Sequence, residues 1–314
     1  MPTGTTTVQG VCPVLETPFT DAGDVDFDSF ERLIDHLLAA GVRSVMFPGF
    51  ASEYYKLREQ EREALTAVLI ERFHRVAGTT VVISIPDHAT AVGIGNARSA
   101  VEMGADMINI LPPHQFGPSG AAVREHLAGI LGAIGSTPAI LQYAPAQTGT
   151  SLDAASIAQM AAVSPNLVQV KVESAPPGQL ISALAAQRPA LGAVVGYAGV
   201  QLIDALRRNA EGVQPGSSFA EIYLAIWRHW ESGEQDSAIA LHTRLLPYIA
   251  YWMQGVELII RAEKRISWLR GIIASDHCRA PSRELDDEER AMIDRFLVEF
   301  AEFFPDGSAK GQLS

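Results

Sequence analysis

The chain has 314 residues, of which 47% are hydrophobic, and it carries 24 basic against 36 acidic side chains, a net charge of −12. A chain of this composition can bury a large core, which excludes intrinsic disorder. The acidic balance, with no basic cluster, argues against nucleic acid and membrane surfaces as partners. Residues 127–152 are uncharged but contain four Gly and two Pro, so they do not predict a membrane-spanning helix.

The start of the chain and its cysteines indicate the compartment. The first ten residues have neither the basic start nor the apolar stretch of a secretory signal, so we expect a cytoplasmic protein. Cys12 and Cys278 lie far apart in the sequence, which predicts reduced thiols rather than a disulfide framework or a zinc site.

Short apolar runs alternate with amphipathic stretches as far as about residue 232. The eight strand candidates begin near Gly10, Ser44, Thr80, Asp106, Pro138, Leu167, Leu191 and Gly212. Between them, residues 26–40, 59–77 and 151–163 have helical periodicity with suitable starts and stops. This rhythm predicts an α/β fold, a (β/α)8 TIM barrel over residues 8–232, with a doubly wound open sheet as the alternative.

The segment after Trp230 has no strand pattern. Residues 235–250, 254–270 and 286–303 predict three helices, and the acidic run from Glu284 to Glu289 favours the start of the last one. We therefore expect a C-terminal three-helix extension over residues 233–305.

Lysine is rare in this chain, and one lysine lies inside a strand candidate. There are four lysines, and Lys171 alternates with Val170 and Val172, so it faces the barrel interior. Burying an ammonium is costly, which favours a neutral amine that can form a Schiff base with a carbonyl. The alternative is a lysine that pairs with Glu173 and reaches to the rim of the barrel.

Glu173 comes two residues after the strand lysine. It lies on the same face, about 6–7 Å nearer the carboxyl-end rim where barrel active sites are found. It could move protons next to an imine, or it could simply neutralise Lys171.

Further candidates lie where the other strands end. The turn Gly49–Glu53 offers backbone N–H groups and the Ser52 hydroxyl, which can hold a carboxylate. The remaining candidates, each of which could equally be a loop cap or a satisfied buried group, are Asp87, His88, His114, Gln142, Tyr143, residues 196–199 and residues 215–218. The last two segments follow strands seven and eight, where many barrels bind phosphate.

Metal and nucleotide sites are poorly supported. The eight histidines include no His-x-His or HExxH grouping, and the Gly93-x-Gly95 pattern lacks the third glycine of a dinucleotide fingerprint. We expect neither a metal nor an organic cofactor.

Five segments, GVCPVLETPF, GFASE, QYAPAQTG, QVKVES and GYAG, occur in an order that resembles the dihydrodipicolinate synthase/N-acetylneuraminate lyase superfamily. The resemblance covers about residues 10–300 and implies a metal-free class I lyase on a (β/α)8 barrel. It implies Lys171 as the Schiff-base lysine for a small 2-oxo acid, and a homo-oligomer, either a dimer or a tetramer. The residues expected at the site are Lys171, Glu173, Gln142 and Tyr143 for catalysis, and Gly49, Ala51, Ser52, His88, Gly196 and Gln214 for substrate binding.

The chain also departs from the synthase pattern. The Gly49–Glu53 turn lacks both threonines of a Gly-Thr-Thr-Gly-Glu loop. Gln142 stands at the usual tyrosine position, Tyr143 at the asparagine position and Gln147 at the arginine position. These losses argue against authentic dihydrodipicolinate synthase.

The sequence is more similar to the L-2-keto-3-deoxyarabonate dehydratase-like branch. The matching segments are Ser52–Glu53, Gln142–Pro145, Lys171–Glu173, Gly271–Ser275 and Arg279–Pro281, with Tyr143 in place of an acidic residue. The resemblance implies dehydration of a 2-keto-3-deoxy sugar acid, although the same iminium supports retro-aldol cleavage. A catalytically silent 2-oxo-acid-binding barrel and a phosphate-binding barrel stay open as alternatives.

Overall fold

Eight parallel strands form one sheet in the computed structural model, which describes residues 6–188 and 190–304. They are β1 (Gly10–Val11), β2 (Ser44–Phe47), β3 (Thr80–Ile85), β4 (Met107–Ile110), β5 (Ala139–Tyr143), β6 (Leu167–Val172), β7 (Gly192–Val195) and β8 (Gly212–Val213). From β2 to β8, each strand pairs with the next strand in the sequence, and β8 also pairs with β1. Pairing of the last strand with the first is what a barrel requires and a doubly wound sheet lacks, so the predicted (β/α)8 barrel is confirmed.

The chain divides into two compact units. The first consists of Met1–Cys12, Ser44–Phe47 and Thr79–Gln214, and the second of Pro13–Arg43, Pro48–Gly78 and Pro215–Ser314. All eight strands belong to the first unit. The predicted division separates two consecutive stretches, a barrel over residues 8–232 and an extension over residues 233–305, whereas these two units each combine distant segments. The predicted division therefore stays a prediction. Residue 305, where the extension is predicted to end, lies outside the described residues.

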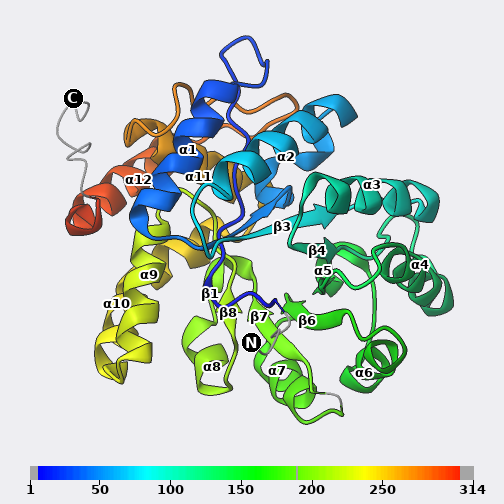
Figure 1. Cartoon of the computed structure of the whole chain (residues 1–314). Coiled ribbons are helices and arrows are strands. Elements are labelled where there is room, and N and C mark those ends of the chain that lie inside the picture. The colour runs from blue at the N-terminus through cyan, green and yellow to red at the C-terminus, as the bar shows by residue number, and fades with distance from the viewer. Residues whose placement is uncertain (1–5, 189, 305–314) are drawn as a thin grey trace. The chain divides into compact units, whose positions relative to one another are not determined.

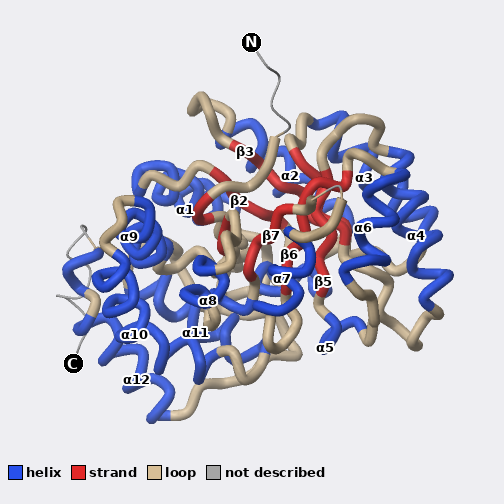
Figure 2. Tube along the Cα trace, turned by 90° about the horizontal axis from the view of Figure 1, so that it is seen from below, coloured by secondary structure: helices blue, strands red, loops and turns tan. Residues whose placement is uncertain are grey.

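The helices of the first unit follow its strands. They are α3 (Thr90–Met103), α4 (Gly120–Ala133), α5 (Pro145–Thr148), α6 (Ala154–Val163), α7 (Gly178–Ala185) and α8 (Leu202–Arg207). Figure 1 shows most of them outside the strands, which Figure 2 draws in red. The α6 helix starts later than the predicted residue 151, because the Asp153 carboxylate accepts a 2.7 Å hydrogen bond from Ser156 N and caps it there.

The second unit is helical. Its helices are α1 (Phe27–Ala40), α2 (Glu59–Phe73), α9 (Ala220–Glu231), α10 (Gln235–Trp252), α11 (Val256–Leu269) and α12 (Asp287–Glu299). The last three confirm the predicted extension. The α2 helix ends before the predicted residue 77, because its stripe of buried side chains ends at Phe73. Within the described part of the chain, we find no helix with both the length and the apolar character needed to span a bilayer.

Candidate active site

Lys171 lies near the carboxyl end of β6, with its side chain buried. Only 4% of the residue is exposed, and its partner in the β5–β6 register is Gln142. Two residues earlier on the same face, Gln169 hydrogen-bonds the backbone of Val8 and the Glu211 carboxylate. The inward face of β6 is therefore polar along its length, as the alternation predicts.

Glu173 contacts both Lys171 and Gln142. Its Oε1 lies 3.5 Å from Lys171 Nζ, and its Oε2 accepts a 2.8 Å hydrogen bond from Gln142 Nε2. The ammonium contact is longer than the 2.7–2.9 Å of a tight charge-assisted hydrogen bond. The carboxylate is thus oriented mainly by the amide, and it faces the lysine amine across a short gap.

Behind this contact lies a chain of buried amides and hydroxyls. Asn109 Nδ2 on β4 donates to Gln142 Oε1 at 2.9 Å and to Ser84 Oγ on β3 at 2.8 Å. All three side chains are at most 3% exposed. Because the Gln142 oxygen is taken by Asn109, its nitrogen must point at Glu173. Sequence reasoning missed Asn109 and Ser84, whose only signal is a polar residue inside an apolar strand.

Gly196, at the end of β7, leaves room for the carboxylate. A Cβ atom at this position would lie 2.3 Å from Glu173 Cγ and 2.5 Å from Oε1. Glycine is therefore required by the close approach of the Glu173 side chain, and it is this packing that places Gly196 at the site.

Cys12 and Gln214 lie at the β1–β8 junction, where Cys12 is close enough to be affected by the Lys171 charge. Gln214 Nε2 is 3.4 Å from Cys12 Sγ, and Gln214 is 3% exposed. Burial raises the pKa of the Cys12 thiol to about 12, against the lowering effects of Gln214 and of the Lys171 charge. The thiol stays protonated at neutral pH and does not compete as a nucleophile. Gln214 Oε1 is buried with no hydrogen bond in the described residues, which leaves an acceptor for a ligand.

Two other predicted residues make contacts elsewhere in the first unit. The Tyr143 hydroxyl accepts a 3.3 Å hydrogen bond from Leu152 N, and Tyr143 pairs in register with Val172 rather than with Lys171. His88 Nδ1 accepts a 3.2 Å hydrogen bond from Gln115 N, and its ring lies edge-on to His114. Glu173 N does donate a 2.9 Å hydrogen bond to the Tyr143 carbonyl, so the backbone of Tyr143 supports the site. Of the three predicted side chains, the structure joins that of Gln142, but neither that of Tyr143 nor that of His88, to the Lys171–Glu173 contact.

The predicted carboxylate-binding turn belongs to the second unit. Ser52 is fully buried, and its Oγ donates to Leu15 O at 2.5 Å while accepting from Gly49 N at 2.8 Å. The hydroxyl is thus committed to holding the turn. The N–H groups of Phe50 and Ala51, at the start of the 3₁₀ turn Phe50–Ser52, are the donors that such a turn leaves free.

The described lysines of the second unit lie closer to their carboxylate partners than Lys171, whose amine is 3.5 Å from Glu173 Oε1. Lys264 is fully buried, contacts Glu53 Oε1, donates to His277 O at 3.0 Å and lies over the Phe19 ring. Lys56 Nζ is 2.9 Å from Glu53 Oε2. Ammonium groups held this closely are suited to structural roles. Sequence reasoning missed the Glu53–Lys264 pair, and Lys310 lies outside the described residues.

The segment 215–218, a candidate phosphate loop, already holds the acidic side chain of Glu263. Ser218 N donates to Glu263 Oε2 at 3.0 Å and Ser218 Oγ does so at 2.5 Å. A Cβ atom on Gly216 would lie 2.1 Å from Glu263 Oε1. The carboxylate of α11 therefore fills the place that a phosphate would take, which argues against the phosphate-binding alternative.

Two buried carboxyls of the second unit predict a stability that falls as the pH rises. Burial raises the pKa values of Glu16 and Glu263 to about 7, from an ordinary 4.5, against the opposing charge of Lys264 at Glu16. Between these values the folded state binds more protons than the unfolded state, so stability is lost as the pH rises through that window. We expect Glu16→Gln, which stays neutral, to raise the free energy of unfolding at pH 8 by about 3 kcal/mol.

Urea unfolding of the wild type and of Glu16→Gln at pH 5 and pH 8 checks this expectation. At pH 5 the two proteins should differ much less, because the wild-type carboxyl is then protonated. A wild-type stability that is constant or rises between these pH values would contradict the raised pKa values.

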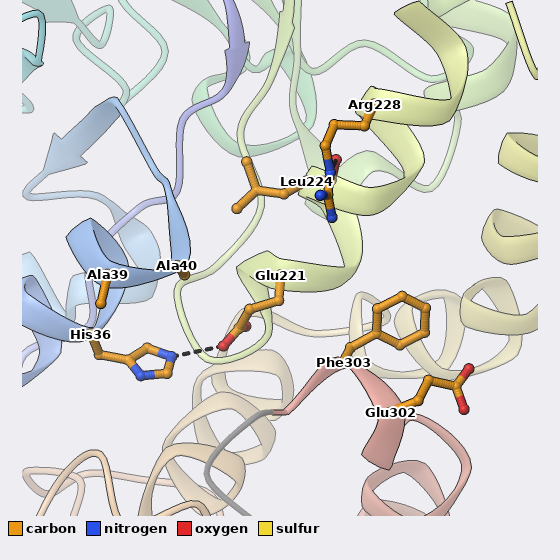
Figure 3. A pocket seen from close by; sticks show the side chains of 8 residues that line it. All are labelled: His36, Ala39, Ala40, Glu221, Leu224, Arg228, Glu302 and Phe303. Carbon is orange, nitrogen blue, oxygen red and sulfur yellow. Dashed lines mark hydrogen bonds and ion pairs between the residues drawn. The ribbon is translucent and has the colours of Figure 1, made fainter. Parts of the chain in front are cut away.

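A pocket of about 420 Å³ opens elsewhere in the second unit, between α1 and α9. Figure 3 shows its polar wall, where His36 Nε2 lies 2.8 Å from the Glu221 carboxylate. Burial acts to raise the pKa of Glu221, but His36 and Arg270 together lower it to about 2. Glu221 is therefore fully paired and stays ionised.

Within residues 6–188 and 190–304, no group of three His, Cys, Asp or Glu side chains is placed to ligate a metal.

Known proteins are similar to this chain over nearly its whole length. The L-2-keto-3-deoxyarabonate dehydratase of Azospirillum brasilense is 28% identical over 292 residues, covering 91% of this chain and 92% of the relative. A 4-hydroxy-tetrahydrodipicolinate synthase of Bdellovibrio bacteriovorus is 27% identical over 299 residues, covering 91% and 95%. The crystal structure of a dihydrodipicolinate synthase from Rhodopseudomonas palustris has a TM-score of 0.85 at 26% identity, covering 93% of this chain and 97% of that one.

The family model agrees with these similarities. Residues 7–299 match the model of the dihydrodipicolinate synthetase family, which includes both the barrel strands and the C-terminal helices. The chain therefore belongs to the dihydrodipicolinate synthetase family and is a lyase or aldolase of that family.

Proposed function

We propose that the protein is a Schiff-base dehydratase of a 2-keto-3-deoxy sugar acid. The observation that carries the proposal is the contact of buried Lys171 with Glu173, whose carboxylate is held by Gln142. A buried amine without a tight ion pair suits attack on a ketone. A carboxylate within reach of that amine suits proton transfer at the neighbouring carbon.

The reaction begins at the Lys171 amine. The neutral amine adds to the C2 ketone of the substrate and water leaves, giving an iminium. Glu173 removes a proton from C3, and the electron pair forms an enamine. The C4 hydroxyl then leaves with a proton, and hydrolysis of the resulting conjugated iminium releases the dehydrated 2-oxo acid and restores Lys171.

Retro-aldol cleavage is the alternative outcome of the same iminium. It requires a base that removes a proton from the C4 hydroxyl, after which the C3–C4 bond breaks. In the chain, Gln142 stands at the position where the resemblance expects the relay tyrosine, and an amide cannot serve as that base. Glu173, next to the lysine, favours C3 deprotonation and hence dehydration.

Product analysis tests the proposal. The enzyme is incubated with a panel of 2-keto-3-deoxy acids, L-2-keto-3-deoxyarabonate among them, and the products are identified by mass spectrometry. We expect a product that has lost one water. Release of pyruvate as the main product would favour the aldolase, and the absence of both turnover and imine formation would favour a silent binding barrel.

Condensation of pyruvate with aspartate semialdehyde is expected to be negligible. The arginine that would hold the second carboxylate of that pathway's substrate is replaced by Gln147, which carries no charge. The assay compares dihydrodipicolinate formation with sugar-acid turnover under the same conditions. Comparable rates would show that another cation binds the second carboxylate.

The expected homo-oligomer, a dimer or a tetramer, is part of the same proposal. Light scattering coupled to size-exclusion chromatography measures it.

A further inference from the structure

Four residues of the first unit form one layer at the carboxyl ends of neighbouring strands. Glu173, Gly196, Gln214 and Cys12 each come one residue after the last paired residue of β6, β7, β8 and β1. The backbone N–H groups of the last three donate to the adjacent strand at 2.9–3.1 Å, so the ladder continues through this layer. Because Glu173 lies two residues after Lys171, the layer faces into the barrel just beyond the lysine.

The side-chain amide of Gln214 is oriented by the Cys12 thiol. Gln214 Nε2 lies 3.4 Å from Cys12 Sγ, and the thiol keeps its proton because burial raises its pKa to about 12. With the nitrogen held by the sulfur, the carbonyl oxygen Oε1 points away from Cys12. This oxygen is buried and has no hydrogen-bond donor among the described residues. A buried acceptor of this kind is rare, and a catalytic role is one of its explanations.

The residue between Glu173 and Gln214 in this layer has no side chain. It is Gly196 on β7, and a Cβ atom there would lie 2.5 Å from Glu173 Oε1. The carboxylate oxygen Oε1 therefore leans from β6 toward the strand beside β8. The same oxygen is 3.5 Å from Lys171 Nζ. The space above Gly196 is thus bordered by the carboxylate on one side and by the strand that bears Gln214 on the other.

The chemistry of imine formation supplies a donor for a lone carbonyl acceptor. When the neutral Lys171 amine adds to the ketone carbon, a proton moves from nitrogen to oxygen and a carbinolamine hydroxyl forms. The nitrogen lone pair then forms the C=N bond, and the hydroxyl leaves as water with a proton from the solvent. That proton balances the one that the Lys171 ammonium released when it became neutral. The ketone has no O–H, and the iminium has no oxygen on this carbon, so the hydroxyl exists only in the intermediate.

We propose that Gln214 accepts a hydrogen bond from the carbinolamine hydroxyl formed at Lys171, and that Cys12 positions the Gln214 amide for this contact. The inference rests on the proposed Schiff-base function and adds a catalytic residue and a positioning residue to it. It concerns the carbonyl carbon alone, so it applies to any 2-oxo acid that the enzyme accepts. Gln142 is not available for this contact, since its amide already bonds Asn109 and Glu173.

Rapid-quench borohydride labelling with pyruvate tests the role of Gln214. Gln214→Met keeps the length of the side chain but removes the acceptor, so the rate constant for imine formation at saturating pyruvate should fall about tenfold. The final extent of labelling and the half-maximal pyruvate concentration should stay within twofold, because neither the ketone nor the iminium carries the hydroxyl. Gln201→Met, which alters an exposed glutamine after β7, is the control and should change none of these values.

Two variants of Cys12 test its positioning role. Cys12→Ala removes the partner of the Gln214 amide, so the rate constant should fall about threefold. Cys12→Ser offers a hydroxyl oxygen to the same N–H group and should keep the rate constant within twofold of the wild type. If Cys12 served only to pack the core, the buried serine would be at least as harmful as alanine. Circular dichroism checks that each variant folds, and the Cys12 variants decide the question if Gln214→Met does not fold.

The outcomes separate this inference from the proposed function. An unchanged rate constant in Gln214→Met would overturn the inference, as would a raised half-maximal concentration with an unchanged rate constant, which would indicate a contact with the substrate itself. Equal rate constants in Cys12→Ala and Cys12→Ser would refute the positioning role. Failure of every 2-oxo acid to label Lys171 in the wild type would instead overturn the proposed function.

Discussion

Replacing Lys171 with arginine is expected to abolish imine labelling and to lower turnover at least about 10⁴-fold. A guanidinium keeps the positive charge next to Glu173 but cannot become a neutral nucleophile. The variant should still fold, because the charge and much of the side-chain volume are retained. Borohydride treatment with a 2-oxo acid, followed by peptide mass spectrometry, measures the label, and circular dichroism measures the fold.

Lys56→Arg is the matched control for this experiment. Lys56 is ion-paired with Glu53 in the second unit, and arginine can keep that pair. Labelling and turnover should therefore persist in Lys56→Arg. A label that maps to Lys56 or Lys264, or that survives in Lys171→Arg, would refute Lys171 as the Schiff-base lysine.

Replacing Glu173 with glutamine should separate imine formation from the steps that follow it. The amide keeps the shape of the side chain but removes the titratable group, so turnover should fall on the order of 10²–10⁴-fold. Labelling of Lys171 should be retained, because the nucleophile is unchanged. Steady-state turnover and borohydride labelling of the same preparation give the two readouts.

Glu211→Gln provides the control for the second experiment. Glu211 accepts a hydrogen bond from Gln169, which lies two residues before Lys171 on β6. Removing the charge of Glu211 should therefore leave turnover nearly unchanged. If turnover in Glu173→Gln stays within a few-fold of the wild type, Glu173 is a structural partner of Lys171 and does not transfer the proton.

The period of a β-strand made the central pair predictable from sequence. Residues two apart on a strand share a face, so the positions of Lys171 and Glu173 followed from their spacing alone. The choice between Gln142 and Tyr143 did not follow from spacing, because it depends on how β5 pairs with β6, and residues 139–143 are all buried, so they show no alternation of buried and exposed positions that would fix this register. The eight strands and three final helices were predictable because each is a local pattern.

Contacts between distant segments could not be predicted in this way. Asn109 and Ser84 stand alone in apolar strands, and only the order of the strands brings them behind Gln142. Glu263 lies on a helix and reaches a loop that begins with Pro215, so the loop read alone resembles an empty phosphate site. The Ser52 hydroxyl likewise looked available until its bond to the Leu15 carbonyl was known.

The close approach of Gly196 to Glu173 ties the evolutionary fates of the two positions together. Any side chain at residue 196 would occupy the space of the Glu173 carboxylate, so a substitution there is harmful while Glu173 is present. Shortening residue 173 removes the conflict but also removes the proposed base. Loss of the carboxylate therefore relaxes the constraint on residue 196, and with a larger residue at 196 a glutamate at 173 must take a shifted side-chain position, away from the one that faces Lys171.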